Sequence, residues 1–285
     1  DSSTSRGLGD VYKRQSTMDG ELLAVLKWTA VYTGFTFLCT AAGAAAVFFL
    51  KPDAKTELAE TLSLGFAAGI MTAASVWSLI IPAQEMAQKQ GDTPWLIASL
   101  GIAAGAGFLK LLDAVLPHLH PGASKPEGPK TKMHRAMLLF LAITLHNIPE
   151  GGSVGLTAGL AAIAGDSASL SAAFALALGI GIQNIPEGAA VSLPLAGQGV
   201  SRWRAFWFGT GSGAVEPLFG ILAALAIPLF LPVMPFMLAF AAGAMLYVVV
   251  EELIPAAHLS QHSDAGTLCF IFGFVIMMAL DTALG

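Results

Sequence analysis

The hydrophobic positions of this 285-residue chain form long, nearly uninterrupted runs, with polar residues gathered in the short stretches between them. Each run holds about 20 apolar residues, which is enough for an α-helix to cross a hydrocarbon core of roughly 30 Å. The pattern therefore predicts an all-α integral membrane protein with eight transmembrane helices. The predicted spans cover residues 22–50, 57–84, 93–116, 134–160, 168–196, 203–230, 232–257 and 265–284.

The composition supports a membrane protein, since 55% of the residues are hydrophobic and only 12% are charged. That charged share is about half the share in an ordinary soluble domain. The longest polar connection, 117–135, is expected to be a flexible cytoplasmic loop, so residues 20–285 are predicted to form a single membrane domain without a nucleic-acid partner. The first fifteen residues are expected to be a non-native tail, because "DVYKRQ" at 10–15 is encoded by one reading frame of a common sequencing-library adapter.

Basic residues predict the orientation in the membrane. With eight spans, nine lysines and arginines fall in one set of alternating loops, and Lys89 alone falls in the other set. The positive-inside rule places the basic loops in the cytoplasm, so both termini are expected on the extracellular or periplasmic side of an inner membrane. The nine basic residues are Lys51, Lys55, Lys110, Lys125, Lys130, Lys132, Arg135, Arg202 and Arg204.

Two short segments recur in the chain and suggest a duplicated unit. "FAAGIM" at 66–71 returns as "FAAGAM" at 240–245, 174 residues later, and "LLDAVL" at 111–116 has an echo in "ALDTAL" at 279–284, 168 residues later. The copies lie in spans that cross in opposite directions. They predict an inverted repeat of spans 1–3 and 6–8 around spans 4–5, a 3+2+3 plan that is common in secondary transporters. Chance similarity of small-residue runs is the alternative.

Polar motifs interrupt the apolar pattern of spans 4 and 5, as "HNIPEG" at 146–151 and "QNIPEG" at 183–188. On a helix, His146 and Glu150 are four residues apart and share one face. The second motif repeats this geometry on the antiparallel neighbour. The proline of each motif removes an internal hydrogen bond and is expected to kink its helix.

The acidic residues of these spans are expected to bind a divalent cation. His146 lies 11 residues beyond Arg135 and Glu216 lies 12 beyond Arg204, which places both roughly 17 Å into the membrane. Ionisable residues at that depth are functional candidates, and no lysine or arginine is available there to pair with them. Histidine and methionine favour a borderline metal such as Zn²⁺ or Fe²⁺ over Ca²⁺ or Mg²⁺.

Two adjacent metal positions are predicted, bridged by Glu150 and Glu187. The first position would use Met71, His146, Glu150, Gln183 and Glu187. The second position would use Asn147, Glu150, Asn184, Glu187 and Glu216.

The motifs resemble the ZIP (ZRT/IRT-like) family of divalent-metal transporters, and the resemblance extends over 20–285. The bacterial branch is expected to be the most similar. The resemblance implies a 3+2+3 helical core, a binuclear midplane centre, and elevator-like movement of metal toward the cytoplasm. Zn²⁺ is the expected substrate, with Cd²⁺, Fe²⁺ and Mn²⁺ as alternatives, and no catalytic cofactor is expected.

Two positions depart from that resemblance. Asn184 stands where many members of the family have aspartate, which predicts weaker binding at the second metal position. Glu251 stands where some bacterial members have a histidine beside the residue equivalent to Glu252. This pair, with His258 and His262 in the following loop, is the predicted cytoplasmic exit site.

Other classes of function were weighed against metal transport. No HExxH motif occurs, and no distinctive nucleophile accompanies His146, so an enzyme is not expected. A proton-coupled carrier of another small solute would need larger recognition groups such as arginine. A passive divalent-metal channel stays open as an alternative. A homodimer also stays open, because spans rich in small residues permit close helix contacts.

Overall fold

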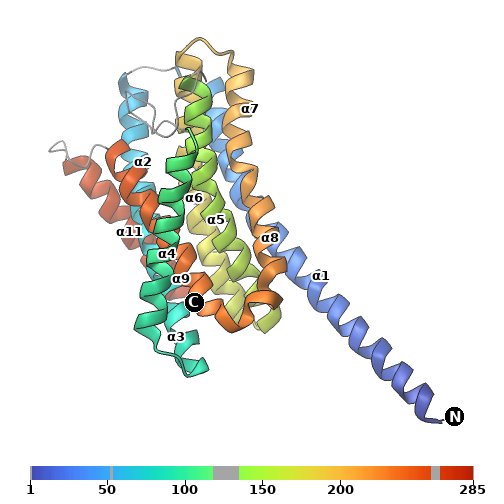
Figure 1. Cartoon of the computed structure of the whole chain (residues 1–285). Helices are drawn as coiled ribbons and strands as arrows, with labels where there is room; N and C mark the ends of the chain where they lie inside the picture. Colours follow the sequence, from blue (N-terminus) through green and yellow to red (C-terminus); the bar gives the residue numbers. More distant parts are fainter. Residues whose placement is uncertain (1, 52–53, 118–134, 258–263, 285) are drawn as a thin grey trace.

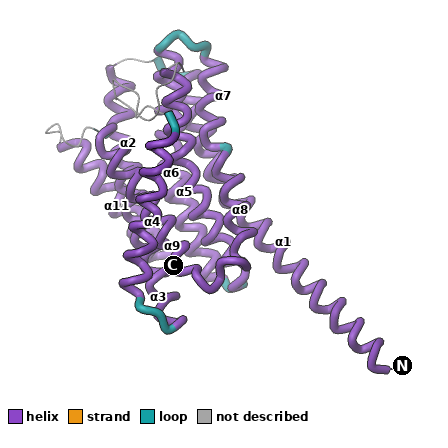
Figure 2. The backbone as a smooth tube through the Cα atoms, viewed as in Figure 1, coloured by secondary structure: helices purple, strands orange, loops and turns teal. Residues whose placement is uncertain are grey.

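The computed structural model describes residues 2–51, 54–117, 135–257 and 264–284, and every regular element within them is helical (Figures 1 and 2). A helix bonds its own backbone groups, which lipid cannot do. The helices are α1 (Ser2–Ala44), α2 (Ala54–Ala74), α3 (Ile81–Gln90), α4 (Pro94–Val115), α5 (Arg135–Ala164), α6 (Ser167–Gly197), α7 (Arg202–Gly213), α8 (Val215–Phe230), α9 (Met234–Val248), α10 (Ile254–Ala256) and α11 (Asp264–Leu284).

Six segments of the described residues are long and apolar enough to cross a membrane. Helix α5 is not among them, although it is 30 residues long, because it carries the polar HNIPEG motif. One of the six is 55 residues long and turns back at a 3₁₀ turn, Leu231–Val233. The six segments are Gly20–Phe48, Thr61–Gln90, Pro94–Val115, Ser167–Gly197, Arg202–Ala256 and Asp264–Leu284.

The helices are interrupted at positions that differ from the prediction. Helices α5 and α6 stay helical through Pro149 and Pro186, where kinks were expected. The chain instead forms π turns after α2, at Ser75–Ile80, and after α9, at Val249–Leu253. These π turns begin 174 residues apart, the separation of the first repeated segment. Helix α7 also ends just before α8, next to Glu216.

The helices pack most extensively in four pairs, which are α1 with α6, α5 with α8, α2 with α11 and α4 with α9. Helices α1, α5, α6, α7 and α8 form one group, which we call the motif group because it carries both IPEG segments. Helices α2, α3, α4, α9 and α11 form the second group, which we call the flanking group. The groups meet mainly where α2 and α11 contact α6 and where α9 contacts α5.

Four glycines let helices of the flanking group pack backbone against backbone. A Cβ atom at any of them would collide with a carbonyl oxygen of the neighbouring helix. The glycines and their carbonyl partners are Gly69 with Phe270, Gly243 with Ile102, Gly105 with Phe240, and Gly273 with Phe66. Adding 174 or 168 residues converts one contact of each pair into the other, so the two halves of the group pack in the same register.

Short connections join the helices at both ends of the bundle (Figure 1). Gly91 and Gly165 adopt left-handed φ angles of 84° and 70° in two of these turns, a conformation that favours glycine. Asp166 caps α6 by accepting hydrogen bonds from Ser169, which hold the pKa of the Asp166 carboxyl below its usual range. The N-terminal part of α1 projects away from the bundle. The suggested non-native origin of residues 1–15 stays a prediction.

Candidate metal centre

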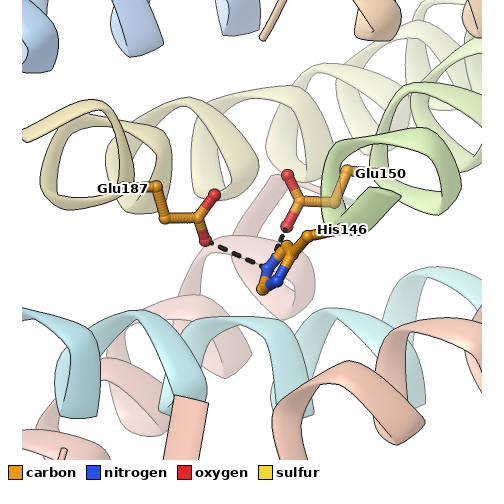
Figure 3. Close-up of side chains that lie close together, drawn as sticks. All are labelled: His146, Glu150 and Glu187. Carbon is orange, nitrogen blue, oxygen red and sulfur yellow. Dashed lines mark ion pairs between the residues drawn. The ribbon is translucent and has the colours of Figure 1, made fainter. Parts of the chain in front are cut away.

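The two IPEG segments meet inside the motif group, where α5 contacts α6. Helix α5 supplies His146 and Glu150, and α6 supplies Glu187 (Figure 3). Nε2 of His146 lies 3.5 Å from Glu150 Oε1 and 3.4 Å from Glu187 Oε1. One ligand atom from each of these residues lies within 4.8 Å of the others, so the three side chains can share one metal ion.

Gln183 joins this cluster from the turn of α6 before Glu187. Its amide donates a hydrogen bond to Glu150 Oε1 and another, 3.4 Å long, to Glu187 Oε1. The amide therefore connects the two carboxylates. Its own oxygen, Oε1, is buried without a hydrogen-bond partner.

The carboxylates of the cluster have no cationic partner except the histidine. Glu150 is 0% exposed and Glu187 is 2% exposed. Among the described residues, their only ion pairs are those with His146. Each carboxylate also has one buried oxygen, Oε2, without a hydrogen-bond partner. Two buried carboxylates in this state are unfavourable unless a cation compensates them. Imidazole nitrogen and carboxylate oxygen are common ligands of Zn²⁺.

Glu252 approaches the histidine from the opposite side. It lies in the π turn Val249–Leu253, and its Oε2 is 3.5 Å from His146 Nδ1. Its neighbour Glu251 is exposed, whereas Glu252 is buried, so the two side chains of the predicted exit site lie in different surroundings. His258 and His262 lie outside the described residues.

The residues predicted for a second metal position form a separate hydrogen-bonded group. Nδ2 of Asn184 donates to both carboxylate oxygens of Glu216 at 2.9 Å, and Thr40 donates to Oε1 at 3.1 Å. Asn147 donates to the carbonyl of Ser212 at 2.9 Å. Neutral donors therefore already occupy the carboxylate of Glu216.

Thr40 was missed in the sequence, although α1 carries a signal for it. Thr29, Thr33, Thr36 and Thr40 recur every three or four residues, and all four are 0% exposed. This spacing follows one helix face. The carbonyl of Thr36 accepts a further hydrogen bond from Asn184 at 3.2 Å.

Met71, the predicted thioether ligand, is completely buried on α2, which packs against α6. The π turn that follows begins with Ser75, whose hydroxyl donates to the Met71 carbonyl at 2.8 Å. The structure thus places Met71 in the core at the border between the two helix groups.

Comparison with known proteins agrees with this arrangement. A family model described as ZIP zinc transporter matches residues 127–281, which include both IPEG segments and Glu216. The chain belongs to the ZIP zinc transporter family. The protein is therefore a membrane transporter and not an enzyme, as the sequence predicted.

Individual members of the ZIP family match most of the chain. Zinc transporter ZIP11 of Xenopus tropicalis is 40% identical over 89% of this chain and 96% of its own length. Zinc transporter GufA of Myxococcus xanthus is 36% identical over 86% of this chain and 95% of its own length. Zinc transporter ZupT of Escherichia coli O7:K1 is 36% identical over 78% and 86%. The expected placement in the bacterial branch is not supported, because the animal protein matches at higher identity.

Proposed function

We propose that this ZIP family protein carries Zn²⁺ across the membrane toward the cytoplasm. The observation that carries the proposal is the buried cluster of His146, Glu150 and Glu187, whose ligand atoms lie within 4.8 Å of one another. Gln183 completes the site by holding the two carboxylates together. The printed names of the similar proteins, all zinc transporters, favour zinc over Cd²⁺, Fe²⁺ and Mn²⁺.

The proposed architecture has eight crossings in a 3+2+3 inverted repeat. Six apolar segments support it, together with α5 and with the reversal inside Arg202–Ala256, since each of these two adds one crossing. The equivalent π turns and the exchanged glycine contacts support the two-fold relation between the halves.

The proposed entry lies at the end of the bundle where α3 ends. A cavity of about 630 Å³ there is lined by Glu85, Lys89, Ser78 and Asp281, among others. Ser78 donates to Asp281 Oδ1 at 2.6 Å, and the other oxygen of this carboxylate is buried without a partner. The positive-inside rule makes this the extracellular or periplasmic end, consistent with an inner membrane and with external termini.

The opposite side of the cluster is closed. The void between His146, Glu187 and Glu252 has a volume of only about 10 Å³ and is also lined by Leu64, Ile143 and Leu253. A void of that size barely holds one water molecule. We propose that release requires the motif group to move against the flanking group, which opens this side and lets Glu252 receive the ion. A passive channel would instead keep one continuous path.

The second metal position is proposed to bind zinc weakly. Asn184 directs N–H donors, not an oxygen ligand, at Glu216 in the structure. A second ion therefore has to displace an amide that is already hydrogen-bonded. The main position does not depend on this displacement.

Uptake of ⁶⁵Zn²⁺ into proteoliposomes tests the proposed function. We expect His146→Ala and Glu187→Gln to lower uptake at subsaturating zinc at least about tenfold, because loss of a metal contact weakens binding by that order. Glu21→Gln, a change to an exposed glutamate of α1, serves as the control and keeps wild-type uptake.

The same vesicles separate a carrier from a channel. In a carrier, unlabelled zinc loaded inside the vesicles accelerates entry of labelled zinc, because the site returns to the outside with an ion bound. A folded wild-type protein without uptake of Zn²⁺, Cd²⁺, Fe²⁺ or Mn²⁺ would reject transport. Uptake without this acceleration would favour the channel.

A further inference from the structure

An apolar groove of about 520 Å³ lies where α2 meets α1 and α6. Small side chains form much of its wall, including Ala42 on α1, Ala59 on α2 and Ala189 on α6. Its floor is tight, because a Cβ at Gly43 would collide with the carbonyl of Ile185. The volume falls within the range of about 300–1,000 Å³ that is typical of small-ligand sites.

The lining of the groove suits a hydrocarbon chain. Ser63 is its one side chain with a polar atom among the lining residues, and Leu50 and Leu193 are at the end nearest the 3₁₀ turn Ala45–Phe48. Ala42 and Ala59 are exposed, so the groove opens sideways from the bundle. In a membrane this direction is filled by lipid tails.

Basic and aromatic side chains lie beyond the Leu50 end. Nη1 of Arg202 donates to the carbonyl of Phe48 at 3.4 Å, and the next residue after Leu50 is the exposed Lys51. The ring of Trp203 is 60% exposed and lies 5.8 Å from that of Phe48. Tryptophan at such a position marks the headgroup level of a bilayer, and basic pockets between membrane helices bind anionic headgroups.

We propose that this groove binds one acyl chain of an anionic glycerophospholipid, with the phosphate beside Arg202 and Lys51. The apolar lining holds the tail, and the positive charge selects the headgroup. The site differs from the metal centre, so its lipid preference does not depend on zinc transport. The groove is walled by both helix groups, which makes the bound lipid a contact between them.

Native mass spectrometry of the full-length protein, titrated with palmitoyl-oleoyl phosphatidylglycerol or phosphatidylcholine, tests the proposal. We expect phosphatidylglycerol to be retained with about fivefold higher affinity, the gain expected from one basic side chain near a headgroup. Arg202→Gln should remove this preference. Lys110→Gln, at an exposed lysine of α4, should keep it.

Filling the groove gives an independent test. Ala59→Phe should lower retention of both lipids at least about fivefold by occupying the space of several methylene groups. Ala103→Phe, at an exposed alanine of α4, should bind lipid like the wild type. Equal retention of the two lipids by the wild type would overturn the proposal. Unchanged retention in a folded Ala59→Phe variant, or a lipid-free dimer in which Ala59→Phe blocks dimerisation, would also overturn it.

Discussion

At the scale of single residues, the metal centre follows from the spacing inside two short motifs. The positions of His146 and Glu150 within one motif, and of Gln183 and Glu187 within the other, place each pair on one helix face. The sequence could therefore predict these four as candidates. The contact of Glu252 with His146 could not be predicted, because it depends on how α9 and its π turn pack against α5.

The residue most informative about metal stoichiometry is Asn184. Asn184→Asp replaces the N–H donors that face Glu216 with oxygen ligands, so we expect the variant to bind two Zn²⁺ ions where the wild type binds one tightly. Isothermal titration calorimetry on detergent-purified protein measures the stoichiometry. Asn184→Ala, which removes the amide without adding a carboxylate, should stay at one tight site. Two equally tight sites in the wild type would contradict this account.

At the scale of helices, close backbone packing controls the flanking group. Gly105 and Gly273 occupy equivalent positions, and each would place a Cβ against a neighbouring carbonyl. We expect Gly105→Ala and Gly273→Ala to lower the free energy of unfolding by a similar amount, about 1–3 kcal/mol, through overpacking. Thermal unfolding in detergent provides the ranking.

Gly107 supplies the matched control for this prediction. It lies on α4, two residues from Gly105, and has open space where its Cβ would be. Gly107→Ala should leave stability within about 1 kcal/mol of the wild type, or raise it slightly, because alanine favours a helix. A loss at Gly107 as large as at Gly105 would show that backbone contact is not the cause.

Helix positions were easier to predict from the sequence than helix irregularities. Long apolar runs identify membrane helices because lipid cannot satisfy exposed backbone groups. Proline predicted interruptions at Pro149 and Pro186, yet both helices continue there. The π turn at Ser75–Ile80 has no equally strong local signal, since it arises where α2 is packed against α9, α11 and α6.

At the scale of the whole molecule, orientation is the feature that the fold alone leaves open. We expect Asp92→Cys, in the turn before α4, to react with a membrane-impermeant maleimide added to intact cells. Gln198→Cys, in the turn before α7, should react only after the membrane is permeabilised. Both positions are exposed, and the background would carry Cys39→Ser and Cys269→Ser. The reverse labelling pattern would contradict the positive-inside prediction.

The central claim is that two antiparallel helices supply one zinc site. Anomalous diffraction at the zinc absorption edge, recorded from zinc-loaded crystals, tests it most directly. The account predicts a strong peak within ligand distance of His146 Nε2 and of carboxylate oxygens from both Glu150 and Glu187. A strong zinc peak elsewhere, with none at this cluster, would contradict the account.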